Sequence, residues 1–222
     1  MRAAIFDVDG TLVDLFDLHL KGFQEVVAEE YELTFEKEDL ERYYGRTGEE
    51  ILREFFKKHG IQGVDLPLIA AKRRQRFISN IDSCKILPGV KKLLAELKDA
   101  KILLAVGSSN PRDIGEAIMQ FCGLASYFPV RVYKSGSMRG KPAPDIFLEA
   151  AKRLKVKPAM CVVIEDSVHG IQAAKAAHMR VVAVATGKHT VGELSAEGPD
   201  LIALSLESLD LPAIEKLFKT EG

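Results

Sequence analysis

The chain has 222 residues, of which 47% are hydrophobic and 28% charged, a composition typical of a globular protein with one or two domains. Its 31 lysines and arginines nearly balance 32 aspartates and glutamates, so no overall positive charge favours binding to nucleic acid or to an anionic membrane. No apolar run approaches the roughly 18 residues of a membrane-spanning helix.

Two further features favour a cytoplasmic protein. The first predicted strand begins almost at Met1, which leaves no room for a signal peptide. The three cysteines lie far apart without the spacing of a metal site, and an odd number fits poorly with a disulfide framework. We therefore expect a cytoplasmic monomer or weak dimer that binds neither nucleic acid nor membranes.

The first predicted strand ends in a pair of acids. Residues 3–6 form a short apolar run, typical of a buried parallel strand, and Asp7 follows at the carboxyl end, where open α/β sheets bind ligands. In an extended chain Asp9 points the same way as Asp7, so both carboxylates can converge on one site, and Gly10 then permits a sharp turn. A nearby cation would relieve the repulsion between the two charges. The alternative is a solvated loop that carries two acids by chance.

The segment after this strand has a helical pattern. Residues 16–31 place apolar side chains at helical spacing, and similar stripes begin at Ile51 and Leu66. Several amphipathic helices between the first two strands predict a separate helical domain over residues 15–85. The chain is expected to return to the first domain near Pro88, which suits the first turn of a following helix.

From residue 86 onward, predicted strands alternate with amphipathic helices. Four strands are predicted, over residues 102–106, 130–133, 161–164 and 181–184. This alternation predicts a doubly wound parallel sheet with right-handed crossovers. No Gly-x-Gly-x-x-Gly follows the first strand, so a dinucleotide-binding fold would lack its phosphate loop. We predict an α/β core over residues 1–14 and 86–222, interrupted by the helical domain.

A polar run follows the second predicted strand of this core. It reads Gly107-Ser108-Ser109-Asn110-Pro111. A serine hydroxyl and backbone N–H groups at a strand end that faces a helix N-terminus can bind an anion. A Ser or Asn that only caps the next helix would leave the same pattern, and the residues alone do not decide between the two.

A third polar motif contains Lys141. This lysine precedes Pro142, which restricts it to extended geometry and keeps it out of the following helix. Pro144 can open that helix at its first turn, with Asp145 favourable near the positive helix end. Most lysines are simply solvated, but the rigid Lys-Pro-x-Pro-Asp frame indicates a fixed side chain.

A second pair of acids ends the strand predicted over residues 161–164. Glu165 and Asp166 follow that strand directly, and Ser167 comes next. A helix N-cap requires one polar residue, so it does not account for a doubled acid. Carboxylate oxygens are the ligands that Mg²⁺ prefers, usually one or two of them together with water and substrate phosphate.

These four motifs, in this order, resemble those of the haloacid dehalogenase-like (HAD) superfamily, and they cover essentially the whole chain. The first is Asp-x-Asp-Gly-Thr at residues 7–11. The chain is most similar to the subgroup with a helical cap after the first motif, which includes phosphoglycolate phosphatase-like, sugar-phosphate phosphatase and β-phosphoglucomutase-like enzymes. The resemblance implies a Rossmann-like core with a cap at residues 15–85, and Mg²⁺-dependent phosphoryl transfer from a small phosphorylated metabolite.

The resemblance also implies roles for the motif residues. Asp7 is the expected nucleophile, which forms an aspartyl-phosphate, and Asp9 is the expected general acid and base. Ser108 and Lys141 would stabilise charge on the phosphoryl oxygens. The expected metal ligands are Asp7, Asp9, Asp166 and Glu165, the last directly or through water. Other phosphate-binding candidates are Thr11, Ser109 and Asn110. Dehalogenases of the superfamily lack an acid at the position of Asp9, which argues against dehalogenation.

The cap is expected to close over the site and select the substrate. By resemblance, His19 matches a position near the general acid in β-phosphoglucomutase-like members, and Arg46 is a second substrate-binding candidate. Such mutases place an arginine where this chain has Gly48, which favours hydrolysis, although Arg46 could substitute. Arg73 extends an apolar stripe, which is compatible with an inward-facing side chain, but we favour the interpretation that it snorkels from a helix edge to solvent.

Three functions compete at this point. The leading hypothesis is a Mg²⁺-dependent phosphatase, the second a β-phosphoglucomutase-like mutase, and the third a signalling receiver domain that is phosphorylated on Asp without turnover. A receiver carries its acceptor on a later strand and lacks the helical insertion. Separately, His178 stands where relatives usually have glycine, which predicts a left-handed turn with a local stability cost and no catalytic effect.

Overall fold

The computed structural model describes residues 1–43 and 47–218. It divides into two compact units, a core of Met1–Asp14 with Lys85–Gly222 and a cap of Leu15–Cys84. The predicted boundary after residue 85 lies one residue from this division. Among the described residues, no helix combines the length and apolar character needed to cross a membrane.

The core is built on a six-stranded sheet with the order β5-β4-β1-β6-β7-β8. All neighbouring strands in it are parallel. The strands are β1 (Ala3–Phe6), β4 (Leu103–Ser108), β5 (Val130–Tyr133), β6 (Cys161–Glu165), β7 (Arg180–Val184) and β8 (Leu201–Ala203). The predicted doubly wound α/β fold is thus confirmed. The three-residue β8 was not predicted, because so short a run carries no periodicity.

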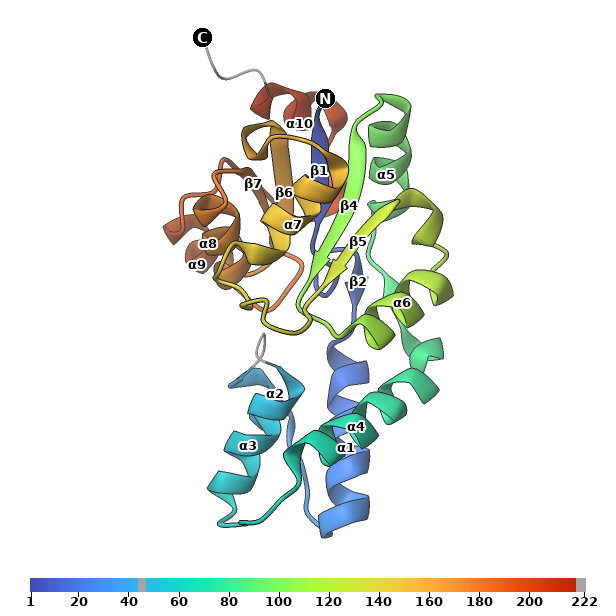
Figure 1. Cartoon of the computed structure of the whole chain (residues 1–222), viewed down its shortest axis with the longest axis vertical. Coiled ribbons are helices and arrows are strands. Elements are labelled where there is room, and N and C mark those ends of the chain that lie inside the picture. Colours follow the sequence, from blue (N-terminus) through green and yellow to red (C-terminus); the bar gives the residue numbers. More distant parts are fainter. Residues whose placement is uncertain (44–46, 219–222) are drawn as a thin grey trace. The chain divides into compact units, whose positions relative to one another are not determined.

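Helices flank the sheet in two groups, one containing α5 and α10, which pack on one another, and one containing α7 and α8 (Figure 1). The core helices are α5 (Val90–Asp99), α6 (Arg112–Phe121), α7 (Asp145–Leu154), α8 (Val168–Ala176), α9 (Val191–Ala196) and α10 (Leu211–Leu217). Short 3₁₀ turns are η2 (Ala125–Tyr127), η3 (Pro158–Met160) and η4 (Leu206–Ser208). Two strand segments where the chain leaves and re-enters the core, β2 (Val13–Asp14) and β3 (Lys85–Ile86), form an antiparallel pair.

The central position of β1 brings the motifs together. This strand pairs with β4 on one side and β6 on the other, with Phe6 opposite Val106 and Ile164. Every residue of β1 is fully buried, because a strand in the middle of a parallel sheet is covered on both faces. Parallel neighbours end at the same edge, so the residues that follow these three strands lie at one edge of the sheet.

The cap is a separate cluster of helices. It contains α1 (Phe16–Tyr31), α2 (Lys37–Glu41), α3 (Gly48–Lys58), α4 (Leu66–Ser79) and the 3₁₀ turn η1 (Ile81–Ser83). Helix α1 has the predicted bounds and packs along α4, which in turn packs on α3. Stacked phenylalanines, for example Phe23 and Phe35 with ring centroids 4.9 Å apart, fill the space between the helices.

Two helices begin one or two residues later, relative to a nearby proline, than the sequence predicted. Pro88 precedes α5 instead of standing in its first turn, since Gly89 is the N-cap with φ of 83°. A Cβ on Gly89 would lie 2.4 Å from the backbone nitrogen of Glu207, so the close approach requires glycine. Pro144 is the N-cap of α7 instead of its first helical residue.

Candidate active site

A buried ion triad joins two strand-end motifs and the loop that contains Lys141. The Nζ atom of Lys141 donates to Oδ1 of Asp7 and to Oε1 of Glu165, each at 2.5 Å. The lysine side chain is 7% exposed and that of Glu165 is 1% exposed. Asp7 follows β1 and Glu165 ends β6, so the sheet topology supplies the carboxylates while the loop before α7 supplies the cation.

Burial shapes the protonation of this triad. Burial of the carboxyl group, only partly offset by Lys141, raises the pKa of Asp7 to about 7. Burial alone would lower the pKa of Lys141, but the charges of Asp7 and Glu165 outweigh it and raise that pKa. The ammonium group therefore stays charged, and it favours the ionised form of the Asp7 carboxylate that touches it.

Glu165 is held on both of its oxygens. Its Oε2 accepts from the backbone N–H groups of Asp166 and Ser167, both at 2.9 Å, and from the Ser167 hydroxyl at 2.8 Å. The Ser167 hydroxyl also caps α8 by accepting from the N–H of Gly170. A Cβ on Gly170 would lie 1.8 Å from Cδ of Glu165. The glutamate is thus locked in place, with its other oxygen on Lys141.

Asp166 lies beside this triad and is 4% exposed. Its Oδ1 accepts from the Thr11 hydroxyl at 3.1 Å, which links the first and fourth motifs. Burial, followed by the negative charges of the neighbouring acids, raises the pKa of Asp166 well above its ordinary value. A buried group of acids of this kind is the oxygen-donor set that suits a hard divalent cation.

The acids form an open set. Within residues 1–43 and 47–218, no group of three or more histidine, cysteine or acidic residues is arranged so that it could hold a metal ion by itself. Mg²⁺ usually keeps several waters and takes one or two carboxylates plus substrate oxygens, so an open set suits it. Asp9 is half-buried in the tight turn after β1, where its backbone forms a β-bridge with Val13, and its negative charge contributes to the raised pKa of Asp166.

Ser108 ends β4 next to β1. Its hydroxyl is buried and accepts from the backbone N–H of Asn110 at 3.1 Å, and Ser109 and Asn110 are half-buried. The alternative that this run caps the next helix is wrong, because the N-cap of α6 is Pro111 and no side chain caps it. The hydroxyl and the turn remain available as an anion-binding group at the same edge of the sheet as Asp7.

Comparison with known proteins identifies the family. The family model described as haloacid dehalogenase-like hydrolase matches residues 4–184. The chain belongs to this family. A relative, the β-phosphoglucomutase of Bacillus subtilis, is 33% identical over 199 residues, covering 86% of this chain and 87% of that protein. The fructose-1-phosphate phosphatase YqaB of Escherichia coli is 33% identical over 183 residues, covering 81% and 94%.

A solved structure supports the same assignment at the level of the fold. The crystal structure of CbbY from Rhodobacter sphaeroides in complex with phosphate superposes with a TM-score of 0.85 and 28% identity, covering 97% of this chain and 100% of that one. The chain is thus an enzyme of the haloacid dehalogenase-like family, and relatives named as phosphatases support phosphomonoester hydrolysis as its activity.

The predicted cap residues of this haloacid dehalogenase-like enzyme lie in different settings. Arg46 lies outside the described residues. His19 is buried on α1, with its ring centroid 4.8 Å from that of Phe77 and its Nδ1 accepting from Arg73. The snorkelling interpretation of Arg73 is wrong, since the side chain is 5% exposed and its guanidinium carbon lies 4.5 Å from the Phe23 ring centroid. Aromatic faces and the imidazole replace the water that snorkelling would have kept.

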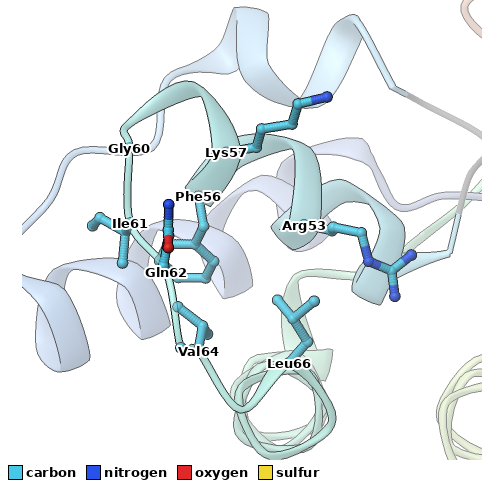
Figure 2. Close-up of a pocket in the computed structure, with 9 residues that line it drawn as sticks. Arg53, Phe56, Lys57, Gly60, Ile61, Gln62, Val64 and Leu66 are labelled. Atoms are coloured by element: carbon cyan, nitrogen blue, oxygen red, sulfur yellow. The ribbon is translucent and has the colours of Figure 1, made fainter.

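The cap also contains a pocket of about 300 Å³ at the turn between α3 and α4. Figure 2 shows its apolar lining from Phe56, Val64 and Leu66, with Arg53 and Lys57 on α3. None of the predicted site residues lines it. Arg53 on this lining donates to Glu49 at 3.0 Å.

Sequence reasoning missed two residues at the core site, Thr186 and Gly187, which follow β7. The Thr186 hydroxyl donates to the carbonyl of Gly10 at 2.5 Å. A Cβ on Gly187 would lie 1.8 Å from Oδ2 of Asp166. The available signal was positional, because the carboxyl end of every parallel strand in such a sheet is a candidate contributor.

Proposed function

We propose that the protein is a Mg²⁺-dependent phosphatase that hydrolyses a small phosphorylated metabolite, a sugar phosphate or a phosphoglycolate-like compound, through an aspartyl-phosphate on Asp7. The observation that carries this proposal is the buried contact of Lys141 with Asp7 and Glu165, each at 2.5 Å. A buried carboxylate held by a cation is aligned as a nucleophile and has a preorganised positive charge beside it.

The acids fit a Mg²⁺ ion. Asp7 and Asp166, which are both buried, would supply carboxylate oxygens to it, and Asp9 is a further proposed ligand. Both oxygens of Glu165 already accept hydrogen bonds from the protein, which supports contact with the ion through water. When bound, Mg²⁺ supplies charge neutralisation for phosphoryl transfer.

The residues then perform a two-step displacement. A carboxylate oxygen of Asp7 attacks phosphorus and the bond to the leaving alkoxide breaks, while Asp9 donates a proton to that alkoxide. Lys141 and the Ser108 hydroxyl stabilise charge on the phosphoryl oxygens. Asp9 next takes a proton from water, which attacks phosphorus, so that inorganic phosphate leaves and Asp7 is regenerated. Thr11, Ser109 and Asn110 remain proposed phosphate-binding residues.

A mutase is the second candidate, because a β-phosphoglucomutase is among the relatives at 33% identity. The cap departs from the mutase pattern at Gly48, where the resemblance predicts arginine. In the cap, a Cβ on Gly48 would lie 3.5 Å from Nη1 of Arg73, so the guanidinium of Arg73 borders this position. His19 and Arg46 stay predicted substrate-binding residues. The receiver-domain alternative has no support once the family is known.

The test is phosphate release from a panel of monoesters, with and without Mg²⁺, by the full chain and by Asp7→Asn. We expect Mg²⁺-dependent release that the variant loses by about 10⁴-fold or more while folding normally. An acid-quenched reaction should show a phosphate-sized mass gain on the peptide with Asp7. A mutase would interconvert sugar phosphates with little net release, and near-wild-type release by the variant would refute the nucleophile.

A further inference from the structure

The segment after β7 clamps the loop of the first motif. Thr186 donates its hydroxyl to the carbonyl of Gly10 at 2.5 Å. The next residue, Gly187, approaches the same loop, since its Cα would lie 3.2 Å from a Cβ built on Gly10. Two loops that are far apart in the sequence therefore pack closely against one another. No role in the proposed chemistry uses either residue after β7.

The carboxylate of Asp166 fits between these two loops. A Cβ on Gly187 would lie 1.8 Å from Oδ2 of Asp166, and a Cβ on Gly10 would lie 2.2 Å from the same atom. Both distances are shorter than any non-bonded contact, so the oxygen occupies space that only paired glycines leave open. A methyl group on either residue would displace it.

The other carboxylate oxygen is held by a hydrogen bond. Oδ1 of Asp166 accepts from the Thr11 hydroxyl at 3.1 Å, and the side chain is 4% exposed. A buried carboxylate with one oxygen bound and the other confined cannot rotate away without losing a hydrogen bond or creating a void. Its position is thus set by Thr11, Gly10 and the segment after β7.

We propose that Thr186 and Gly187 are positioning residues for Asp166, and that they set the affinity of the active site for its divalent cation. This inference rests on the proposed function, in which Asp166 is a metal ligand. Outer-sphere groups that orient a ligand commonly change metal affinity by about 10–100-fold when altered. Gly187 acts by leaving room for the carboxylate, and Thr186 acts by fixing the loop that carries Gly187.

The experiment measures Mn²⁺ binding to the full chain by electron paramagnetic resonance, together with the Mg²⁺ concentration dependence of phosphate release. Gly187→Ala is expected to weaken Mn²⁺ binding about tenfold or more, and to lose less turnover at saturating Mg²⁺ than at low Mg²⁺. The matched control is Gly192→Ala on α9, where the nearest atom to a new Cβ is Thr190 Oγ1 at 3.9 Å. Its Mn²⁺ affinity should equal that of the wild type.

Thr186 provides a second pair of variants that adds no bulk. Thr186→Val removes the hydroxyl and should weaken Mn²⁺ binding by several-fold, whereas Thr186→Ser keeps the donor and should restore it. If Gly187→Ala does not fold, the two Thr186 variants still test the positioning proposal. The proposal is overturned if the folded variants bind Mn²⁺ like the wild type, even when their melting temperatures fall, because a merely structural role would lower stability alone.

Measurements on the wild type distinguish a failure of this proposal from a failure of the proposed function. If the wild type binds Mn²⁺ and releases phosphate while the Thr186 and Gly187 variants keep full affinity, only the positioning inference fails. If the wild type neither binds Mn²⁺ nor releases phosphate from any monoester, the proposed function fails and the positioning inference fails with it.

Discussion

Within the part of the chain that the structure describes, the core and the cap each bury a cationic side chain, and they hold it in different ways. Lys141 in the core lies between two carboxylates at 2.5 Å. Arg73 in the cap lies against two aromatic rings, with its guanidinium carbon 4.5 Å from the Phe23 centroid and 5.6 Å from the Phe77 centroid, and donates to His19. The core cation is held mainly by opposite charge, whereas this part of the cap uses π faces and a ring nitrogen.

The difference has a consequence for what each cation can do. Opposite charges buried together are strongly interdependent, and removing one partner leaves the others uncompensated. A cation on aromatic faces contributes less, about 0.5–2 kcal/mol per contact. We therefore expect stability to respond strongly to removal of the core cation and weakly to removal of the cap cation.

Removing the core cation should have the largest effect. In Lys141→Met, Asp7 and Glu165 lose their shared donor, so the free energy of unfolding is expected to fall by about 3–5 kcal/mol. Turnover should fall about 10²–10³-fold, since a preorganised charge at the phosphoryl group is lost. Urea unfolding in the presence of a chelator measures the first, and phosphate release at saturating Mg²⁺ measures the second.

The matched control for this change is Lys152→Met, an exposed lysine on α7. Its unfolding free energy should stay within about 0.5 kcal/mol of the wild type, with full turnover. Equal losses for Lys141 and Lys152 would contradict the view that the buried charge contacts are what matter.

The two regions should also respond to pH with opposite signs. Burial raises the pKa of Asp7 from 3.8 to about 7, so the folded core binds that proton more tightly than the unfolded chain. Its contribution to stability is complete below pH 3.8 and is lost as the pH rises through about 7. Asp166, whose pKa is also raised, acts in the same direction.

In the cap, Asp39 behaves in the opposite way. Burial opposes ionisation, but hydrogen bonds from Lys58 and from the Glu36 N–H outweigh it, and the pKa of Asp39 is lowered. Its contribution is present above the ordinary carboxyl range and is lost as the pH falls through the lowered value. Each group thus affects stability in its own pH window.

The measurement is the melting temperature of the metal-free protein between about pH 5 and about pH 7.5. We expect it to fall by several degrees as the pH rises, because Asp7 must ionise in a buried site next to Glu165 and Asp9, which Lys141 offsets only in part. Added Mg²⁺ should restore more stability at the higher pH, and Asp7→Asn should weaken the dependence. A melting temperature that rises over this range would contradict the raised pKa of Asp7.

Removing the cap cation should have a smaller effect. Arg73→Met keeps most of the buried volume but loses the ring contacts and the donor to His19, so we expect a loss of about 1–2 kcal/mol in unfolding free energy. Arg76→Met, on the exposed side of α4, breaks only a surface ion pair with Glu29 and should cost under about 1 kcal/mol. Urea unfolding of both variants tests this, and equal costs would mean that burial of Arg73 adds nothing.

The same contrast explains what could be predicted from the sequence. The core motifs were predictable because parallel strands end at one edge, so Asp7, Ser108 and Glu165 had to lie near each other once the strands were found. The resemblance placed Lys141 in the same site as Asp7, but its second contact, with Glu165, was not predicted. The buried state of Arg73 was not predictable, because the direction of a side chain at a helix edge depends on which rings the neighbouring helices present.

Gly187 was missed for a related reason. A glycine after a strand has no functional side chain. The proposed role of Gly187 rests on the distance of only 1.8 Å between a Cβ built on it and Oδ2 of Asp166. Close approach of two backbones is a property of tertiary packing, which a pattern of residue types within one segment does not record.

The smallest expected effect concerns His178, which belongs to neither cluster. The predicted left-handed turn is confirmed, with φ of 56°, a conformation that strains residues with a Cβ. His178→Gly should therefore raise the unfolding free energy by up to about 1 kcal/mol, less the backbone entropy that glycine gains in the unfolded chain. His178→Ala, which keeps the Cβ, should give no gain. Thermal unfolding separates the two, and a gain in both variants would assign the cost to the imidazole instead of the backbone. Because His178 is exposed and lies outside the four motifs, turnover should stay at the wild-type level in both variants.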